Sequence, residues 1–413
     1  METTVAIPVE ELKIGMYVCD LDRPWLETSF LTQGFRISSV DQIKQLKDLC
    51  EYVYIDSEYV IGETDREKLR NISSNQKNVE KDKTNIHKRN WGDSPRIDYK
   101  NRHSIQDELP KAKYLHHWLS NSLKGAIDTL KSGGSINVKL LKEAVNPLID
   151  SVIRNPDAAM WLARMRKADQ YSYEHAVSVS IWITAFGRYL GLPKEDLREL
   201  ALGGLLFDIG KARIPKCVLE QPRKLIDKEF DLVKRHVVWS VKILESTAGI
   251  SPRVLEIAAH HHERHDGSGY PQHLKGTEIP LFARMAAIVD CYDAITSKRT
   301  YARSLSPHEA IRKLYEWRDK DFQAELVEEF IQAIGLYPAG SLVELNTGEV
   351  AVVIAQSRSR RLKPQVMLIL DAQKQPLEEF RTLDLFDESA KHLEISRSLE
   401  PGCYGINPDE LYI

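Results

Sequence analysis

The feature that most constrains the fold of this chain is a long stretch of helical periodicity, from about residue 113 to residue 338. Leu123, Ile127 and Leu130 are spaced for one face of a helix. A second segment repeats this helical spacing with Leu140, Leu141, Val145, Leu148, Ile149 and Val152. The pattern predicts a domain built almost entirely of helices.

One helix of this stretch has a start signal that can be located to the residue. Ser306 is a residue type that caps helices, Pro307 suits the first helical turn, and Glu309 completes a capping box. We expect a helix that starts directly after Ser306 and runs toward Trp317.

The chain on either side of the helical stretch follows other patterns, which together predict a multidomain protein. Residues 1–62 mix short apolar runs with one amphipathic segment, residues 40–49, and this indicates a small α+β domain. Residues 63–112 are polar and charged, with too few apolar positions for a core, which predicts a linker. Residues 339–413 alternate with period two around a turn at 346–348, which predicts a small β-rich module.

The composition excludes several classes of function. The 413 residues carry a formal charge of -3, so the chain as a whole does not attract a nucleic-acid polymer. The five cysteines are scattered and form no CxxC pair, which is typical of free thiols in a reducing compartment. No segment reads as a signal peptide or as a membrane span. We therefore expect a cytoplasmic protein with neither a membrane nor a nucleic acid as its partner.

Six histidine and aspartate residues of the helical stretch lie in apolar surroundings and are candidates for a metal centre. They are His175, Asp208, His236, His261, His262 and Asp290. Divalent transition metals that hydrolyse phosphodiesters use imidazole and carboxylate ligands, and two ions about 3.5–4 Å apart can clamp the phosphoryl oxygens. A single histidine on an apolar helix is more often an ordinary core residue. Periodicity alone does not bring these six residues together.

The same residues belong to motifs that resemble the HD-GYP family of cyclic dinucleotide phosphodiesterases. The resemblance covers about residues 165–335, and its motifs follow one another in the family's order. The motifs are Tyr173-Glu174-His175, Asp208-Ile209-Gly210-Lys211, His236, His261-His262-Glu263, Asp266-Gly267-Ser268-Gly269-Tyr270-Pro271 and Asp290-Cys291-Tyr292-Asp293-Ala294. Residues 1–61 resemble a domain of unknown function that often precedes HD-GYP domains, and we expect it to serve for input or for homodimer formation.

The resemblance implies an all-α HD-type helical bundle with two sites for a divalent transition metal, which would be iron, manganese or zinc. The first ion would be held by His175, Asp208 and Asp290. The second ion would be held by His236, His261 and His262. Asp208 would bridge the two ions.

Other residues take roles from the same resemblance. Asp208 and Lys211 would be catalytic residues. Lys211 and Arg299 match positions that contact the substrate phosphates, and Arg303 is a further candidate for this contact. The loop of Gly269, Tyr270 and Pro271 resembles the family's docking loop, whose suspected partners are diguanylate cyclase domains.

Three positions depart from the family pattern. Phe207 stands where the His-Asp pair would have its histidine, and a phenyl ring offers neither a lone pair nor a charge. Tyr171 stands where members with three metals carry a glutamate, so we expect no third metal. Ala302 replaces a lysine that some members carry, although Arg303 lies beside it.

The resemblance implies a bacterial signalling enzyme that hydrolyses cyclic di-GMP to pGpG or GMP. Because Phe207 offers no metal ligand, a second interpretation stays open, in which the domain binds cyclic di-GMP as an effector and hydrolyses it weakly or not at all. A phosphodiesterase that prefers cyclic GMP-AMP is also open, because no residue can be assigned to contact the bases.

Overall fold

The computed structural model describes residues 4–23, 35–56, 91, 95–164, 171–219, 221, 223–297, 304–356, 362–390, 392–400 and 402–406. The side chains of residues 171 and 172 are outside this description. The chain divides into two compact units, of which one comprises residues 1–90 with 357–363 and the other comprises residues 91–356 with 364–413.

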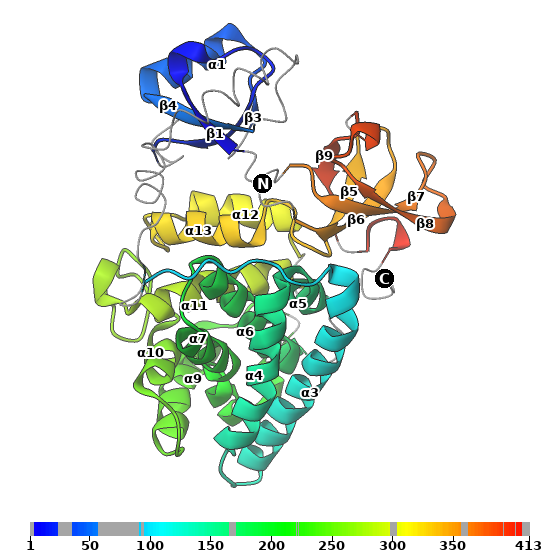
Figure 1. Ribbon diagram of the computed structural model, residues 1–413. Helices are drawn as coiled ribbons and strands as arrows, with labels where there is room; N and C mark the ends of the chain where they lie inside the picture. Colours follow the sequence, from blue (N-terminus) through cyan, green and yellow to red (C-terminus); the bar gives the residue numbers. More distant parts are fainter. Residues whose placement is uncertain are drawn as a thin grey trace. The chain divides into compact units, whose positions relative to one another are not determined.

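The first unit contains an antiparallel sheet of four strands in the order β1-β4-β2-β3, together with a helix (Figure 1). Its elements are β1 (Thr4–Pro8), η1 (Val9–Glu11), β2 (Tyr17–Leu21), β3 (Phe35–Arg36), α1 (Val40–Leu49) and β4 (Tyr52–Asp56). Ser39 caps α1 by accepting a hydrogen bond from the backbone N–H of Gln42 at 3.3 Å. Ile7, Val18 and Leu46 are fully buried between the helix and the sheet. The predicted α+β fold of this region is confirmed.

The second unit is mainly helical, as the sequence predicts (Figure 1). Its helices are α3 (Ile105–Lys131), α4 (Val138–Arg154), α5 (Pro156–Arg164), α6 (Tyr171–Tyr189), α7 (Lys194–Leu206), η6 (Ile209–Arg213), α8 (Lys216–Leu219), α9 (Asp227–Glu245), α10 (Pro252–His260), η7 (Gly276–Glu278), α11 (Leu281–Thr296), α12 (Pro307–Glu316) and α13 (Ala324–Ile334). Helix α7 packs against α4, α6 and α10, so that the end of α7 lies deep in the bundle.

One residue that was predicted for the apolar face of α4 is exposed instead. Leu141, Val145 and Leu148 are buried, whereas Leu140 is 55% exposed. Consecutive residues of a helix point about 100° apart, so Leu140 cannot share the face that Leu141 occupies.

The helix start predicted at Ser306 is confirmed. The Ser306 hydroxyl accepts a hydrogen bond from the backbone N–H of Glu309 at 3.3 Å, and the Glu309 carboxylate accepts one from the backbone N–H of Ser306 at 2.8 Å. The helix ends at Glu316, with Trp317 as its C-cap.

The C-terminal part of the second unit is an antiparallel sheet of five strands in the order β8-β7-β6-β5-β9, which confirms the predicted β-rich module. Its elements are β5 (Leu342–Leu345), β6 (Val350–Ala355), β7 (Gln365–Leu370), β8 (Pro376–Asp384), η8 (Glu388–Ala390), β9 (Ile395–Ser398) and η9 (Cys403–Gly405). The predicted turn between β5 and β6 uses Gly348 at a φ of 91°, a backbone conformation that favours glycine.

The sheet shares an apolar core with α3 and α5. Trp161 of α5 is fully buried in one cluster with Leu109 of α3 and with Leu342 and Val352 of the sheet. The sheet is therefore packed against the helical bundle.

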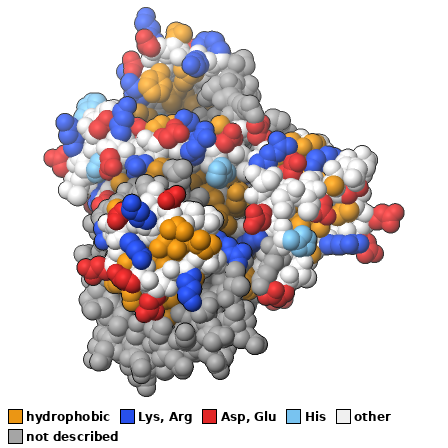
Figure 2. Space-filling model, turned by 90° about the horizontal axis from the view of Figure 1, so that it is seen from above, with side chains coloured by type: hydrophobic (Ala, Val, Ile, Leu, Met, Phe, Trp, Pro, Cys, Tyr) orange, Lys and Arg blue, Asp and Glu red, His pale blue; other side chains and the backbone are white. Residues whose placement is uncertain are grey.

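The charged surface side chains and the state of the cysteines agree with what the composition predicts. On the face drawn in Figure 2, Lys and Arg side chains are interspersed with Asp and Glu side chains among the coloured residues. The five cysteines are free thiols. Within the described ranges, the helices are too short or too polar for any of them to cross a bilayer.

Candidate metal centre

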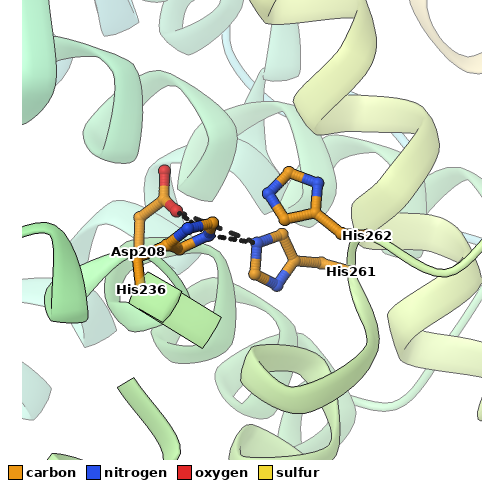
Figure 3. Close-up of side chains that lie close together, drawn as sticks. All are labelled: Asp208, His236, His261 and His262. Carbon is orange, nitrogen blue, oxygen red and sulfur yellow. Dashed lines mark hydrogen bonds and ion pairs between the residues drawn. The ribbon is translucent and has the colours of Figure 1, made fainter. Parts of the chain in front are cut away.

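Asp208, His236, His261 and His262 meet in the interior of the helical bundle (Figure 3). Asp208 lies in the turn between α7 and η6, His236 lies in α9, and the two adjacent histidines follow directly from α10. One ligand atom from each of the four residues lies within 4.8 Å of the others. The fold thus brings together four of the six residues that the sequence singles out as metal ligands.

The close packing of η6 on α9 places Asp208 beside His236, and it depends on Gly210. The backbone N–H of Gly210 donates a hydrogen bond to the buried hydroxyl of Ser240 at 2.8 Å. A Cβ atom at Gly210 would lie 2.1 Å from the carbonyl oxygen of His236 and 2.5 Å from the backbone nitrogen of Ser240. Only glycine permits this approach of two backbones.

Backbone carbonyls determine which ring nitrogen carries the proton in His236 and His261. The Nδ1 atom of His236 lies 2.6 Å from the carbonyl oxygen of Val233, and Nδ1 of His261 lies 3.1 Å from that of Ala258. A carbonyl oxygen only accepts, so each Nδ1 carries the proton and donates. In a neutral ring the lone pair is then on Nε2.

These two lone pairs face each other. Nε2 of His236 lies 3.4 Å from Nε2 of His261 and 3.1 Å from Oδ1 of Asp208. Oδ1 of Asp208 is buried and accepts no hydrogen bond. A shared cation between these atoms satisfies all three of them.

The charges of the cluster suit a divalent transition metal. Burial lowers the pKa of His261 to about 4, and it also lowers the pKa of His262 well below its ordinary value. Burial alone would raise the pKa of Asp208, but the positive charge of the Lys211 ammonium holds that pKa well below its ordinary value. These imidazole lone pairs and the carboxylate are typical ligands of iron, manganese and zinc. The residues present therefore fit a bound metal ion.

His175 and Asp290 lie on the other side of Asp208. Nε2 of His175 is 3.0 Å from Oδ1 of Asp290 and 3.8 Å from Oδ2 of Asp208. Burial would raise the pKa of Asp290, but its hydrogen bond with His175 keeps this pKa below the ordinary value. Lys211 folds back from η6, and its ammonium group forms an ion pair with Oδ2 of Asp208. His175, Asp290 and Lys211 thus all adjoin the cluster.

The position of His175 is set by Asp293, whose role the sequence left open. Oδ2 of this buried carboxylate lies 2.6 Å from Nδ1 of His175. A carboxylate on one ring nitrogen fixes the orientation of the other nitrogen. The spacing of Asp290 and Asp293, three residues apart on one face of α11, was the available signal.

Comparison with known proteins agrees with this geometry. Residues 160–326 match the family model described as an HD domain, residues 4–141 match a domain of unknown function (DUF3391), and residues 342–404 match a KOW domain associated with the HD domain. The chain is 33% identical over 368 residues to the cyclic di-GMP phosphodiesterase PA4108 of Pseudomonas aeruginosa, covering 89% of this chain and 85% of that protein. This chain belongs to the HD-GYP family.

Other known proteins match a smaller part of the chain. It is 31% identical over 194 residues to 3'3'-cGAMP-specific phosphodiesterase 2 of Vibrio cholerae, covering 46% of this chain and 37% of that protein. The solved structure of Bd1817, an HDG"Y"P protein from Bdellovibrio bacteriovorus, aligns with a TM-score of 0.46 and 18% identity, covering 79% of this chain and 98% of that one.

Phe207 takes the position of the first histidine in the HD-GYP pattern. Its ring is fully buried, and its centroid lies 4.6 Å from that of His261 and 6.0 Å from that of His175. Both contacts are edge-to-face, which is a favourable arrangement of aromatic rings. The residues on the His175 side therefore offer a metal one ligand fewer than the HD-GYP pattern has.

The Gly-Tyr-Pro loop of this HD-GYP chain is anchored by Glu263, a residue of one sequence motif to which no role was assigned. The buried Glu263 carboxylate accepts hydrogen bonds from the backbone N–H groups of Gln272 and Leu274, at 2.7 and 3.2 Å. A Cβ at Gly269 would lie 2.3–2.5 Å from backbone atoms of residues 262–264, so this position also requires glycine.

The loop also contacts the cluster. The Tyr270 ring stacks on His262 with centroids 4.7 Å apart, while Pro271 is exposed. Of the remaining predicted residues, Arg299, Arg303 and the side chain of Tyr171 lie outside the described residues.

Proposed function

We propose that this protein is a metal-dependent phosphodiesterase that hydrolyses cyclic di-GMP to pGpG or GMP. The observation that carries this proposal is the pair of facing Nε2 atoms of His236 and His261 beside the buried Asp208 carboxylate, in a chain of the HD-GYP family. Support for the substrate comes from the Pseudomonas aeruginosa relative named a cyclic di-GMP phosphodiesterase, which matches over most of both chains.

In this proposal Asp208, His236, His261 and His262 hold a divalent transition metal, for which iron, manganese and zinc are all suitable. When bound, the ion supplies a Lewis acid and lowers the pKa of water. Asp208 stays anionic, and the partly exposed Lys211 ammonium offers a positive charge to a phosphate that carries developing negative charge. Arg299 and Arg303 are proposed as further phosphate contacts.

The hydrolysis adds one water molecule across each phosphodiester that is cleaved. A new bond forms between the water oxygen and phosphorus, the bond from phosphorus to the ribose 3'-oxygen breaks, and that oxygen takes up a proton. One such cycle opens the ring to pGpG, and a second cycle yields GMP.

A second candidate function is favoured by Phe207. Because this position provides no metal ligand, the domain would bind cyclic di-GMP as an effector and hydrolyse it slowly or not at all. Cyclic GMP-AMP is an alternative substrate, since a Vibrio cholerae relative is named for it.

Product analysis tests these functions. Purified full-length protein would be incubated with cyclic di-GMP or cyclic GMP-AMP at saturating Mn²⁺, and the products would be separated by chromatography. We expect pGpG or GMP from cyclic di-GMP, and no product after chelation of the metal. Tight binding of cyclic di-GMP without product, in both the wild type and Phe207→His, would contradict the enzyme and support the effector.

The proposal also includes partners and organisation. The exposed Pro271 is a contact for diguanylate cyclase domains, and residues 1–62 act as a regulatory or dimerisation domain. Residues 63–112 were predicted as a linker, but residues 105–112 belong to α3 and bury Ile105, Leu109 and Ala112 in the core, so only the residues before α3 are proposed as the linker. Limits of the helical domain at residues 113–338 and of the β-rich module at residues 339–413 remain predictions. Free thiols are consistent with a location in the cytoplasm.

A further inference from the structure

The two sides of the Asp208 carboxylate differ in what they offer a cation. On the Oδ1 side, Nε2 atoms of His236 and His261 face each other while both Nδ1 atoms donate to backbone carbonyls. That side has lone pairs directed at one point. A cation bound there removes their repulsion.

On the Oδ2 side the donor groups already have partners. The two ring nitrogens of His175 contact Asp293 and Asp290, at 2.6 and 3.0 Å. The ammonium of Lys211 forms an ion pair with Oδ2 of Asp208. Each carboxylate on this side therefore has a cationic or hydrogen-bonding partner from the chain itself.

Phe207 lies between the two sides and offers a ligand to neither of them. Its fully buried ring lies edge-on to both His175 and His261, and it belongs to the apolar core of the bundle. A phenyl ring cannot ligate a metal. The space where a further ligand would stand is filled by carbon.

We propose that the centre holds one metal ion per chain, on the Oδ1 side of Asp208, and that the Lys211 ammonium takes the place of a second ion on the Oδ2 side. This inference rests on the metal-dependent function proposed for the protein, and it differs from the two ions that the family resemblance predicts. A lysine ammonium can stabilise negative charge on a phosphoryl group, as a metal ion does.

Metal stoichiometry tests this inference without any measurement of activity. Purified full-length protein would be dialysed against increasing Mn²⁺, with bound manganese measured by mass spectrometry and its electronic coupling by electron paramagnetic resonance. We expect one Mn²⁺ per chain with an uncoupled spectrum. Two Mn²⁺ ions with a coupled spectrum would overturn the inference and leave the proposed function intact, whereas no bound manganese would overturn both.

Variants of Phe207 and Lys211 test where the single ion binds and whether the lysine takes the place of a second ion. Phe207→His restores an imidazole and is expected to raise the stoichiometry to two, whereas Phe207→Leu, the matched apolar control, stays at one. Lys211→Met is expected to bind a second, weaker equivalent of Mn²⁺ because Oδ2 of Asp208 loses its cation. A Lys211→Met protein that binds only one equivalent would overturn the role given to Lys211. Should Phe207→His fail to fold, the wild-type spectrum and Lys211→Met still decide the question.

Discussion

A hydrogen bond at one ring nitrogen of a buried histidine orients the other nitrogen, which can then bind a metal. His236 and His261 meet this condition through carbonyls of their own helices, three residues earlier in each case. Their Nε2 atoms therefore need no further side chain to direct them, in contrast to His175, which is oriented by Asp293.

Removal of one of these rings should remove the metal. We expect His236→Ala to lower metal affinity by more than about 100-fold, because the loss of a direct ligand has a larger effect than the loss of a residue that only hydrogen-bonds to a ligand. Metal content after dialysis would measure this. His117→Ala, at an exposed position of α3, is the matched control and should keep its metal. A His236→Ala protein with wild-type affinity would exclude His236 as a ligand.

The burial of His261 predicts a dependence of stability on pH in the metal-free protein. Its pKa is about 4 in the folded state, against about 6.5 in an exposed chain. The unfolded state therefore binds more protons between these values, and the contribution of His261 is complete above pH 6.5 and lost as the pH falls toward 4. The free energy of unfolding should fall by about 3 kcal/mol across this window.

Chemical denaturation at a series of pH values, with a chelator present, would measure this fall. The variant His261→Gln does not titrate and should show a shallower dependence than the wild type. Identical slopes for the two proteins between pH 6.5 and 4 would be incompatible with a neutral, buried His261.

At the scale of elements, the contact between η6 and α9 forms the site. Asp208 precedes η6, His236 lies in α9, and Gly210 lets the two backbones touch. The geometry of the centre therefore depends on a residue that carries no functional group.

This contact makes Gly210 sensitive to one added methyl group. We expect Gly210→Ala to lower the free energy of unfolding by about 3 kcal/mol, because backbone atoms of α9 must move to admit a Cβ. It should also weaken metal binding. Gly125→Ala is the control, since no atom lies within 4 Å of its Cβ position in α3, and it should stabilise the protein by about 0.5–1 kcal/mol. Equal stability of both variants in denaturant titrations would argue against the close approach.

At the scale of the whole second unit, the bundle and the C-terminal sheet share one apolar cluster. Trp161 and Leu162 of α5 lie in it together with Val350 and Val352 of β6. The backbone N–H of Gln356, directly after β6, also donates a hydrogen bond to Asp157 of α5 at 3.3 Å. These contacts couple the stability of the sheet to that of the helices.

Trp161→Ala should therefore destabilise both parts. The loss of a fully buried indole costs about 3–5 kcal/mol. Native-state hydrogen exchange would show faster exchange of amides in both α5 and β6. Trp118→Ala, at a partly exposed position of α3, is the control and should have a small effect. Faster exchange in α5 alone would mean that the sheet folds independently.

The sequence by itself determined the features that depend on near neighbours. Helical periodicity, the capping box at Ser306 and the turn at Gly348 are local, because each arises from interactions within a few residues of the chain. The sequence also contains the residue types and the motifs of the six candidate ligands. These motifs indicated the family, but they did not give the distances between the residues.

Only the tertiary structure decided features that depend on residues far apart in the chain. The hydrogen bonds that Glu263 accepts from the loop and the packing of the sheet on α5 both depend on which surfaces meet. The same holds for the facing Nε2 atoms and for Phe207 between two histidine rings. Local sequence signals specify elements, but the packing of those elements sets the distances on which metal binding depends.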